Sequence, residues 1–209
     1  MEGKMTMTDR APVFGNIRSD YLARVARLDR IEERCSALGV TRGPGCYRIP
    51  FFSQEYTITA DAIHDDRGNP PHHAVCVVLC QYLLLYRDTV LADASLVTYK
   101  DFRDAAPYVG GFKSTVEAPI ARHFTGKVRR LERNCRKLGG RPFDTDVACQ
   151  LAFQLTALPR VPVFLLFHDA DEDFPAQGTL LFQKDAASYL DMECIAMVGS
   201  TLTSWLQGG

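Results

Sequence analysis

Two short hydrophobic runs near the end of the chain, residues 161–167 and 179–182, lie on either side of an acidic loop. Both runs are rich in Leu, aromatic and β-branched residues and are bounded by Pro or Gly, which is typical of core strands. A further apolar run, 146–154, is joined to the strand at 161–168 through residues 156–160. This connection is too short for a parallel crossover and predicts an antiparallel pair.

A second set of alternating apolar residues predicts a hairpin, with strands at 46–49 and 55–59. A short strand is also expected at 96–99. Together these segments predict an α+β fold, a mostly antiparallel sheet of about five strands with helices packed on it. No Pro-, Ser- or Gly-rich linker divides the chain, so we expect one domain over residues 18–209, preceded by a mobile arm at residues 1–17.

Helical periodicity marks the remaining elements. Residues 19–38 carry an apolar residue every three or four positions and predict one amphipathic helix that ends at Gly39. Residues 72–86 are apolar nearly all round and predict a central, covered helix. Further helices are expected at 118–124, at 125–138 with Thr125 as the N-cap, and at 191–206. The residues expected to be largely buried are Val77, Leu84, Val163, Leu165, Phe167 and Leu202.

Composition narrows the class of protein. The chain has 209 residues, 46% of them hydrophobic, and a net charge of −1, so no global field attracts it to nucleic acid or to an anionic membrane. We find no signal peptide and no apolar run long enough to cross a bilayer. Seven cysteines, an odd number without a Cys-x-x-Cys pair, favour reduced thiols and a cytoplasmic location.

The central helix carries one candidate site. His73, Cys76 and Cys80 are spaced so that all three lie on one helix face, where they could bind a cofactor or a metal. The alternative is that both thiols belong to the core, because free Cys is among the most buried residue types. In that case Cys76 and Cys80 should be alkylated more slowly than Cys35 and Cys135, which lie on amphipathic helices.

The acidic loop carries a second candidate site. Asp169, Asp171 and Asp173 alternate as in the opening of a calcium loop, with His168 and Glu172 beside them. The loop lacks the required Gly at its sixth position, which is Phe174. A looser Mg²⁺ or Mn²⁺ site remains open, as does a solvated turn that separates two apolar strands.

The helix expected at 125–138 is strongly basic. It carries Lys127, Arg129, Arg130, Arg133, Arg136 and Lys137 against the single acid Glu132. Such a face can bind a polyanion. The lack of interleaved aromatic residues or a known reading motif disfavours nucleic acid and is compatible with a solvated helix face.

Residues 158–190 resemble the C-terminal signature of an uncharacterised prokaryotic family, domain of unknown function 3786. The matching positions are Pro159, Pro162, Asp171, Glu172, Asp173, Phe174, Pro175, Leu181 and Phe182, whereas Gln183 replaces an expected acid. Residues 46–58, 81–83 and 138–154 are also similar. The resemblance implies a protein of anaerobic prokaryotes, related to chains that are sometimes fused to iron–sulfur domains, and it implies no catalytic residues.

Two functional hypotheses follow. The first is a binding or accessory protein of anaerobic redox or one-carbon metabolism, which holds a small-molecule ligand or meets a redox partner at a pocket between sheet and helices. The second is a metal-dependent enzyme that uses the acidic loop. The motifs of serine hydrolases, nucleotide-binding proteins and zinc proteases are absent, so the sequence leaves enzymatic activity, cofactor and oligomeric state open.

Overall fold

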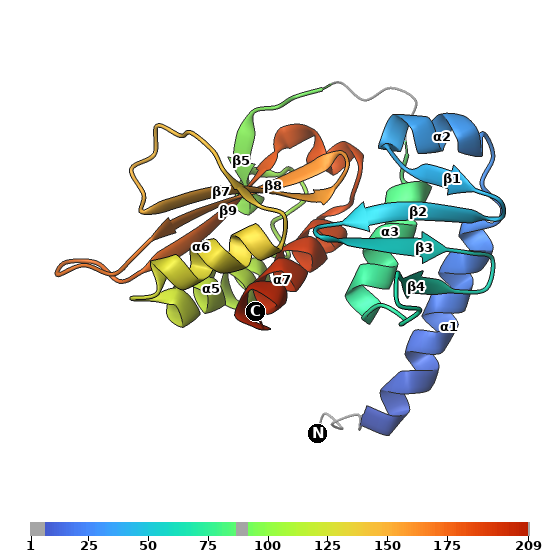
Figure 1. Cartoon of the computed structure of the whole chain (residues 1–209), viewed down its shortest axis with the longest axis horizontal. Coiled ribbons are helices and arrows are strands. Elements are labelled where there is room, and N and C mark those ends of the chain that lie inside the picture. The colour runs from blue at the N-terminus through green and yellow to red at the C-terminus, as the bar shows by residue number, and fades with distance from the viewer. Residues whose placement is uncertain (1–6, 87–91, 209) are drawn as a thin grey trace.

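The structure is a computed structural model that describes residues 7–86 and 92–208 (Figure 1). Its first half contains α1 (Met7–Val25), α2 (Ile31–Leu38), β1 (Thr41–Gly43), β2 (Cys46–Phe51), β3 (Gln54–Ile58), β4 (Ile63–Asp65) and α3 (His73–Leu84). Its second half contains β5 (Leu96–Thr98), η1 (Tyr99–Asp101), α4 (Val109–Phe112), η2 (Lys113–Glu117), α5 (Ala118–Phe124), α6 (Val128–Lys137), β6 (Arg141–Pro142), β7 (Leu151–Leu158), β8 (Val161–His168), β9 (Gln177–Gln183), η3 (Lys184–Ser188) and α7 (Met192–Gly208).

The described strands form two antiparallel sheets, so the α+β class is confirmed. The sheet of the first half has the order β1-β2-β3-β4, and that of the second half has the order β5-β9-β8-β7-β6. The expected antiparallel sheet of about five strands is present, but the hairpin of β2 and β3, expected to belong to it, pairs with the short neighbouring strands β1 and β4 instead. Local partners were available on both sides of the hairpin, and they completed a sheet of their own.

The helix expected at residues 19–38 is two helices. The chain leaves α1 after Val25 and enters α2 through Arg30, whose φ of 51° lies in the left-handed region. The apolar period continues across the break because both helices bury residues in the same core, including Leu22, Val25 and Leu38. Helix α1 begins at Met7, within the expected arm, and residues 1–6 of that arm lie outside the described residues.

The pair β7 and β8 is antiparallel, as expected, but β7 lies later in the sequence than predicted. Polar residues 144–146 are exposed, and the strand begins at Leu151, where inward and outward positions start to alternate. Only Pro159 and Arg160 remain as the turn to β8. This tight turn packs against α2, where a Cβ added at Gly39 would lie 2.9 Å from Pro159 Cβ.

Hydrogen bonds fix the two halves to each other around this turn. The Tyr82 hydroxyl of α3 donates to Leu38 O (2.7 Å) and accepts the Arg160 N–H (3.2 Å). Arg160 Nε donates to Ala37 O (2.8 Å). At the same end of β7, Phe52 N donates to Ala157 O (3.0 Å). The two sheets are therefore joined by specific contacts and share one continuous core.

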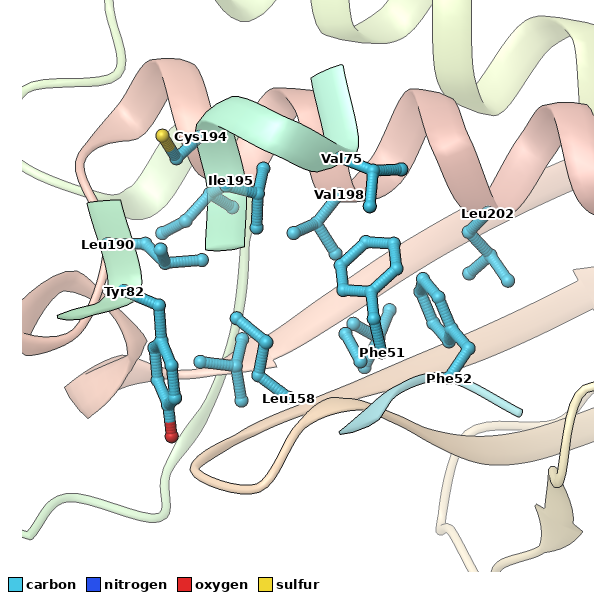
Figure 2. Packing of buried hydrophobic residues seen from close by; sticks show 14 of the residues in the cluster. Phe51, Phe52, Val75, Tyr82, Leu158, Leu190, Cys194, Ile195, Val198 and Leu202 are labelled. Atoms are coloured by element: carbon cyan, nitrogen blue, oxygen red, sulfur yellow. The ribbon is translucent and has the colours of Figure 1, made fainter. Parts of the chain in front are cut away.

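Helix α7 runs between the two halves (Figure 1). Figure 2 shows its residues Ile195, Val198 and Leu202 near Val75 of α3 and near Phe51 and Phe52 of the hairpin. Trp205 extends this cluster, since its ring lies 5.7 Å from the centroids of both Phe51 and Phe52. The expected closing helix and the expected central helix α3 are thus confirmed, and they pack against each other.

The expected core is confirmed except at one position. Val77, Val163, Leu165, Phe167 and Leu202 are buried, whereas Leu84 is only half-buried. Helix α3 ends at Leu84, and its apolar stripe is completed by the preceding residue, Leu83, which is fully buried. An apolar run on all sides of a helix does not reveal which of two adjacent Leu residues faces inward.

These neighbours provide a stability test. We expect Leu83→Ala to lower the free energy of unfolding by about 2–5 kcal/mol, because it leaves a cavity in a closed core. Leu84→Ala should lower it by about 1 kcal/mol or less. Urea denaturation followed by circular dichroism measures both values, and equal losses would contradict the inward orientation of Leu83 at the end of α3.

Candidate ligand-binding cleft

A cleft of about 750 Å³ lies in the second half, between η1, the helical segment 109–125 and the start of β9. Its walls are formed by Thr98, Tyr99, Lys100, Val109, Phe112, Lys113, Glu117, Ala118, Ala121, Arg122, Thr125, Pro175, Ala176, Gln177, Gly178 and Thr179. The acidic β8–β9 loop thus contributes its last residues, Pro175 and Ala176, to one wall. The cleft brings together three segments that are distant in the sequence.

One wall is a continuous helix with a π-helical turn. Helices α4 and α5 are joined by η2, where Ala118 N donates to Lys113 O, five residues back. Pro119 has no N–H to donate, and the Thr115 hydroxyl bonds back to Gly111 O (2.8 Å), so regular α-helical hydrogen bonding is interrupted here. Such turns within α-helices occur frequently at functional sites.

Two glycines let this helix pack closely between β9 and α7. A Cβ at Gly178 of β9 would lie 3.0 Å from Ile120 Cγ2, and one at Gly199 of α7 would lie 2.8 Å from Phe112 Cε2. The absent side chains allow the neighbouring backbones to approach closely. The helical wall of the cleft is consequently held on two sides.

The apolar floor of the cleft is also well supported. The rings of Tyr99 and Phe112 stack in parallel, with centroids 4.1 Å apart. The Tyr99 hydroxyl donates to Met192 O (2.8 Å), and burial raises the pKa of Tyr99 to about 12. Tyr99 therefore remains a neutral scaffold residue over the physiological pH range.

Glu117 is the charged group that is most enclosed in the cleft. Burial raises the pKa of its carboxyl above the ordinary value, while the hydrogen bond from Leu180 N (3.3 Å) and the charges of Lys113 and Lys100 act in the opposite direction. Arg122 also lines the cleft. Lys113 and Lys100 therefore act on one partly desolvated carboxylate, and with Arg122 the lining carries a net positive charge when all four groups are ionised.

The candidate residues of α3 are not among those that line this cleft. Cys76 and Cys80 are buried, and His73 is half-buried. The two thiols are hydrogen-bonded to each other, which raises the pKa of Cys80 and lowers that of Cys76. The greater exposure expected of Cys35 and Cys135 is not found, because both are also buried. An amphipathic helix buries its apolar stripe completely when a neighbouring element covers it.

The acidic loop uses its carboxylates to shape the turn. Asp169 Oδ1 accepts hydrogen bonds from Gly126 N (2.8 Å) and Ala170 N (2.9 Å). Asp171 Oδ1 accepts from Asp173 N (2.9 Å) and Phe174 N (2.8 Å). Across residues 7–86 and 92–208, no three His, Cys, Asp or Glu side chains are grouped so that they could hold a metal ion. The candidates His168, Asp169, Asp171, Glu172 and Asp173 thus lie along one loop without such a grouping.

The basic helix α6 begins at Val128, without a side-chain cap from Thr125. Lys127, Arg129, Arg133, Arg136 and Lys137 are exposed along it. Arg136 pairs with Glu132 (2.9 Å), and its guanidinium lies 5.4 Å from the centroid of the Phe153 ring. Among the described helices, none is both long and apolar enough to cross a membrane.

The structure is thus an α+β protein with a cleft between η1, the helical segment 109–125 and β9. The chain belongs to the family described as domain of unknown function (DUF3786), whose model matches residues 30–205. No curated protein and no solved structure matches the chain. The matched range includes every residue that lines the cleft and excludes helix α1.

The residues of the cleft were missed by sequence reasoning. Lys100, Lys113, Glu117 and Arg122 come from a segment in which the sequence shows no catalytic or binding motif. The available signals were indirect. Gly110-Gly111 and Pro119 flank the π-helical turn, but either feature alone predicts only a helix boundary.

The raised pKa of Glu117 predicts that the effect of this residue on stability depends on pH. Burial raises the carboxyl pKa in the folded state, so folding favours the protonated form. The contribution of this carboxyl to the free energy of unfolding is therefore lost as the pH rises through the folded-state pKa. Glu117→Gln should therefore stabilise the protein at about pH 7.5 and have a smaller effect at about pH 5. Urea denaturation at both pH values, with the exposed Glu55→Gln as control, tests this. A stability difference that does not depend on pH would contradict it.

Alkylation provides a test of the thiols. Cys46 and Cys149 are the two partly exposed cysteines, and the other five are buried. Mass spectrometry after brief treatment with iodoacetamide should find Cys46 and Cys149 modified first, since burial blocks the access of the reagent to the other five thiols. Early modification of Cys76 or Cys80 would mean that this pair is open to solvent.

Proposed function

We propose that this chain is a small-ligand-binding protein and that the cleft between η1, the helical segment 109–125 and β9 is its binding site. The observation that carries the proposal is the cleft itself. Its volume of about 750 Å³ falls within the range of ligand pockets, about 300–1,000 Å³. A well-formed apolar pocket with a few convergent polar groups is the usual form of such a site.

The construction of the walls supports this proposal. The stacked rings of Tyr99 and Phe112 and the close contacts at Gly178 and Gly199 give the site fixed sides before any ligand enters. A preformed site reduces the ordering that binding requires. The cations and the partly desolvated Glu117 offer specific polar contacts within a largely apolar cleft.

The proposal also covers the metabolic role and the cellular location of the protein. A role in anaerobic redox or one-carbon metabolism, with a redox partner, is supported by the family resemblance alone. A cytoplasmic location is supported by the seven cysteines, all of which are free thiols. A metal-dependent enzyme that uses the acidic loop gains no support from the local hydrogen bonds of Asp169 and Asp171.

Polyanion binding by α6 is a second candidate function, favoured by one observation. Lys127, Arg129, Arg133 and Lys137 are exposed along a helix whose only acid, Glu132, pairs with Arg136. Such a face would bind phosphates with strong salt dependence. The cleft remains the better-supported site because it combines shape, apolar surface and charge.

Blocking the cleft tests the first proposal. Ala118→Trp places a large side chain on the cleft wall, at an exposed position of α5, whereas Ala37→Trp is a matched change at an exposed position of α2 outside the cleft. Ligand-observed NMR with a library of small metabolites should yield binders that the Ala118→Trp protein loses and the Ala37→Trp protein retains. Binders that both variants retain, or a library without binders, would refute the cleft as a binding site.

A further inference from the structure

We infer that the ligand of this cleft is an amphipathic organic anion, held by Lys100, Lys113 and Arg122 and taken up together with a proton on Glu117. This inference rests on the proposed function and specifies its ligand class. It follows from the charges that line the cleft, the position of the carboxylate among them and the apolar surface beside them.

The cations come from separate elements that converge on one space. Lys100 lies in η1, Lys113 in η2 and Arg122 in α5, and all three line the cleft. Glu117 is the one acid among the lining residues. Two cationic charges therefore remain when every group is ionised, and a site with this surplus favours an anion over a neutral or cationic ligand.

Glu117 makes the uptake of an anion sensitive to protons. It lies four residues after Lys113, its carboxylate accepts the N–H of Leu180 from β9, and Lys100 faces it from η1. An entering anion would add like charge beside a carboxylate that burial already disfavours, and protonation removes that repulsion. His123 of the following helix, α5, has a pKa that is lowered by burial and by Arg130 and Lys127.

The apolar part of the lining indicates the rest of the ligand. Val109, Phe112, Ala121 and Pro175 line the same cleft as the cations. Removing apolar surface from water on these walls would contribute to affinity, while the cations would fix the orientation of the charged group. An acid with an aromatic or aliphatic body matches both features, whereas a small inorganic anion would leave the apolar walls uncovered.

Isothermal titration calorimetry with phenylmethanesulfonate tests the inference. This probe stays ionised throughout the working range, so any pH dependence belongs to the protein. Its affinity should fall between about pH 5.5 and about pH 7.5, with proton uptake visible as a dependence on buffer ionisation enthalpy. The neutral phenylmethanesulfonamide should bind at least about tenfold more weakly.

Three variants show which residues are responsible for sulfonate binding and for its pH dependence. Lys113→Gln should weaken sulfonate binding about tenfold, as expected for the loss of a charged hydrogen-bond donor. Lys137→Gln, the same change at an exposed position of α6 outside the cleft, should leave the affinity unaltered. Glu117→Gln should abolish the pH dependence and bind the sulfonate at neutral pH more tightly than the native protein does.

The outcomes separate the ligand class from the function. Equal affinity for sulfonate and sulfonamide, with both lost in Ala118→Trp, would overturn the anion inference and leave the cleft as a small-ligand site. A pH dependence that persists unchanged in Glu117→Gln would overturn the role of that residue. Sulfonate binding that Lys113→Gln and Lys137→Gln alter equally would remove the assignment to the cleft. Phenylacetate and phenyl phosphate, compared in the same way, would show whether the site prefers a carboxylate or a phosphate head group.

Discussion

The packing of α7 against two different partners is the constraint on which the rest of the structure depends. On one side α7 meets α3 and the Phe51–Phe52 corner of the hairpin, where Trp205 contacts both rings. On another side Gly199 lets the helix with the π-helical turn approach so closely that a single methyl group would collide with Phe112. One helix therefore unites the two sheets and also positions the cleft wall, so the core and the site share the same support.

Local patterns were sufficient to predict most elements, and long-range pairing explains the errors. The spacing of apolar residues identified α3, β8 and α7 because each is long and strongly apolar. The same spacing did not reveal the break at Arg30, since α1 and α2 bury their stripes in one core. It also did not separate the hairpin from the second sheet. That choice depends on contacts such as Phe52 with Ala157, which join residues distant in the sequence.

The cleft was harder to predict than the fold, for a physical reason. Its charged residues are single Lys, Arg and Glu side chains, which occur on any solvated surface, and only the tertiary structure brings Lys100 near Lys113 and Glu117. The acidic loop was predicted as a candidate metal site because its carboxylates are close together in the sequence. In the structure two of those carboxylates accept backbone hydrogen bonds, and the contribution of the loop to the cleft comes from Pro175 and Ala176.

The π-helical turn makes the cleft sensitive to chain length as well as to composition. Its hydrogen bond from Ala118 N to Lys113 O spans one residue more than an α-helical bond. Deleting a single residue here would allow regular α-helical bonding, yet it would rotate the preceding helix by about 100° relative to α5. Phe112 would then turn away from Gly199, and Lys113 away from the cleft. Insertions and deletions in this turn are therefore a more severe change for the site than most substitutions of its individual side chains.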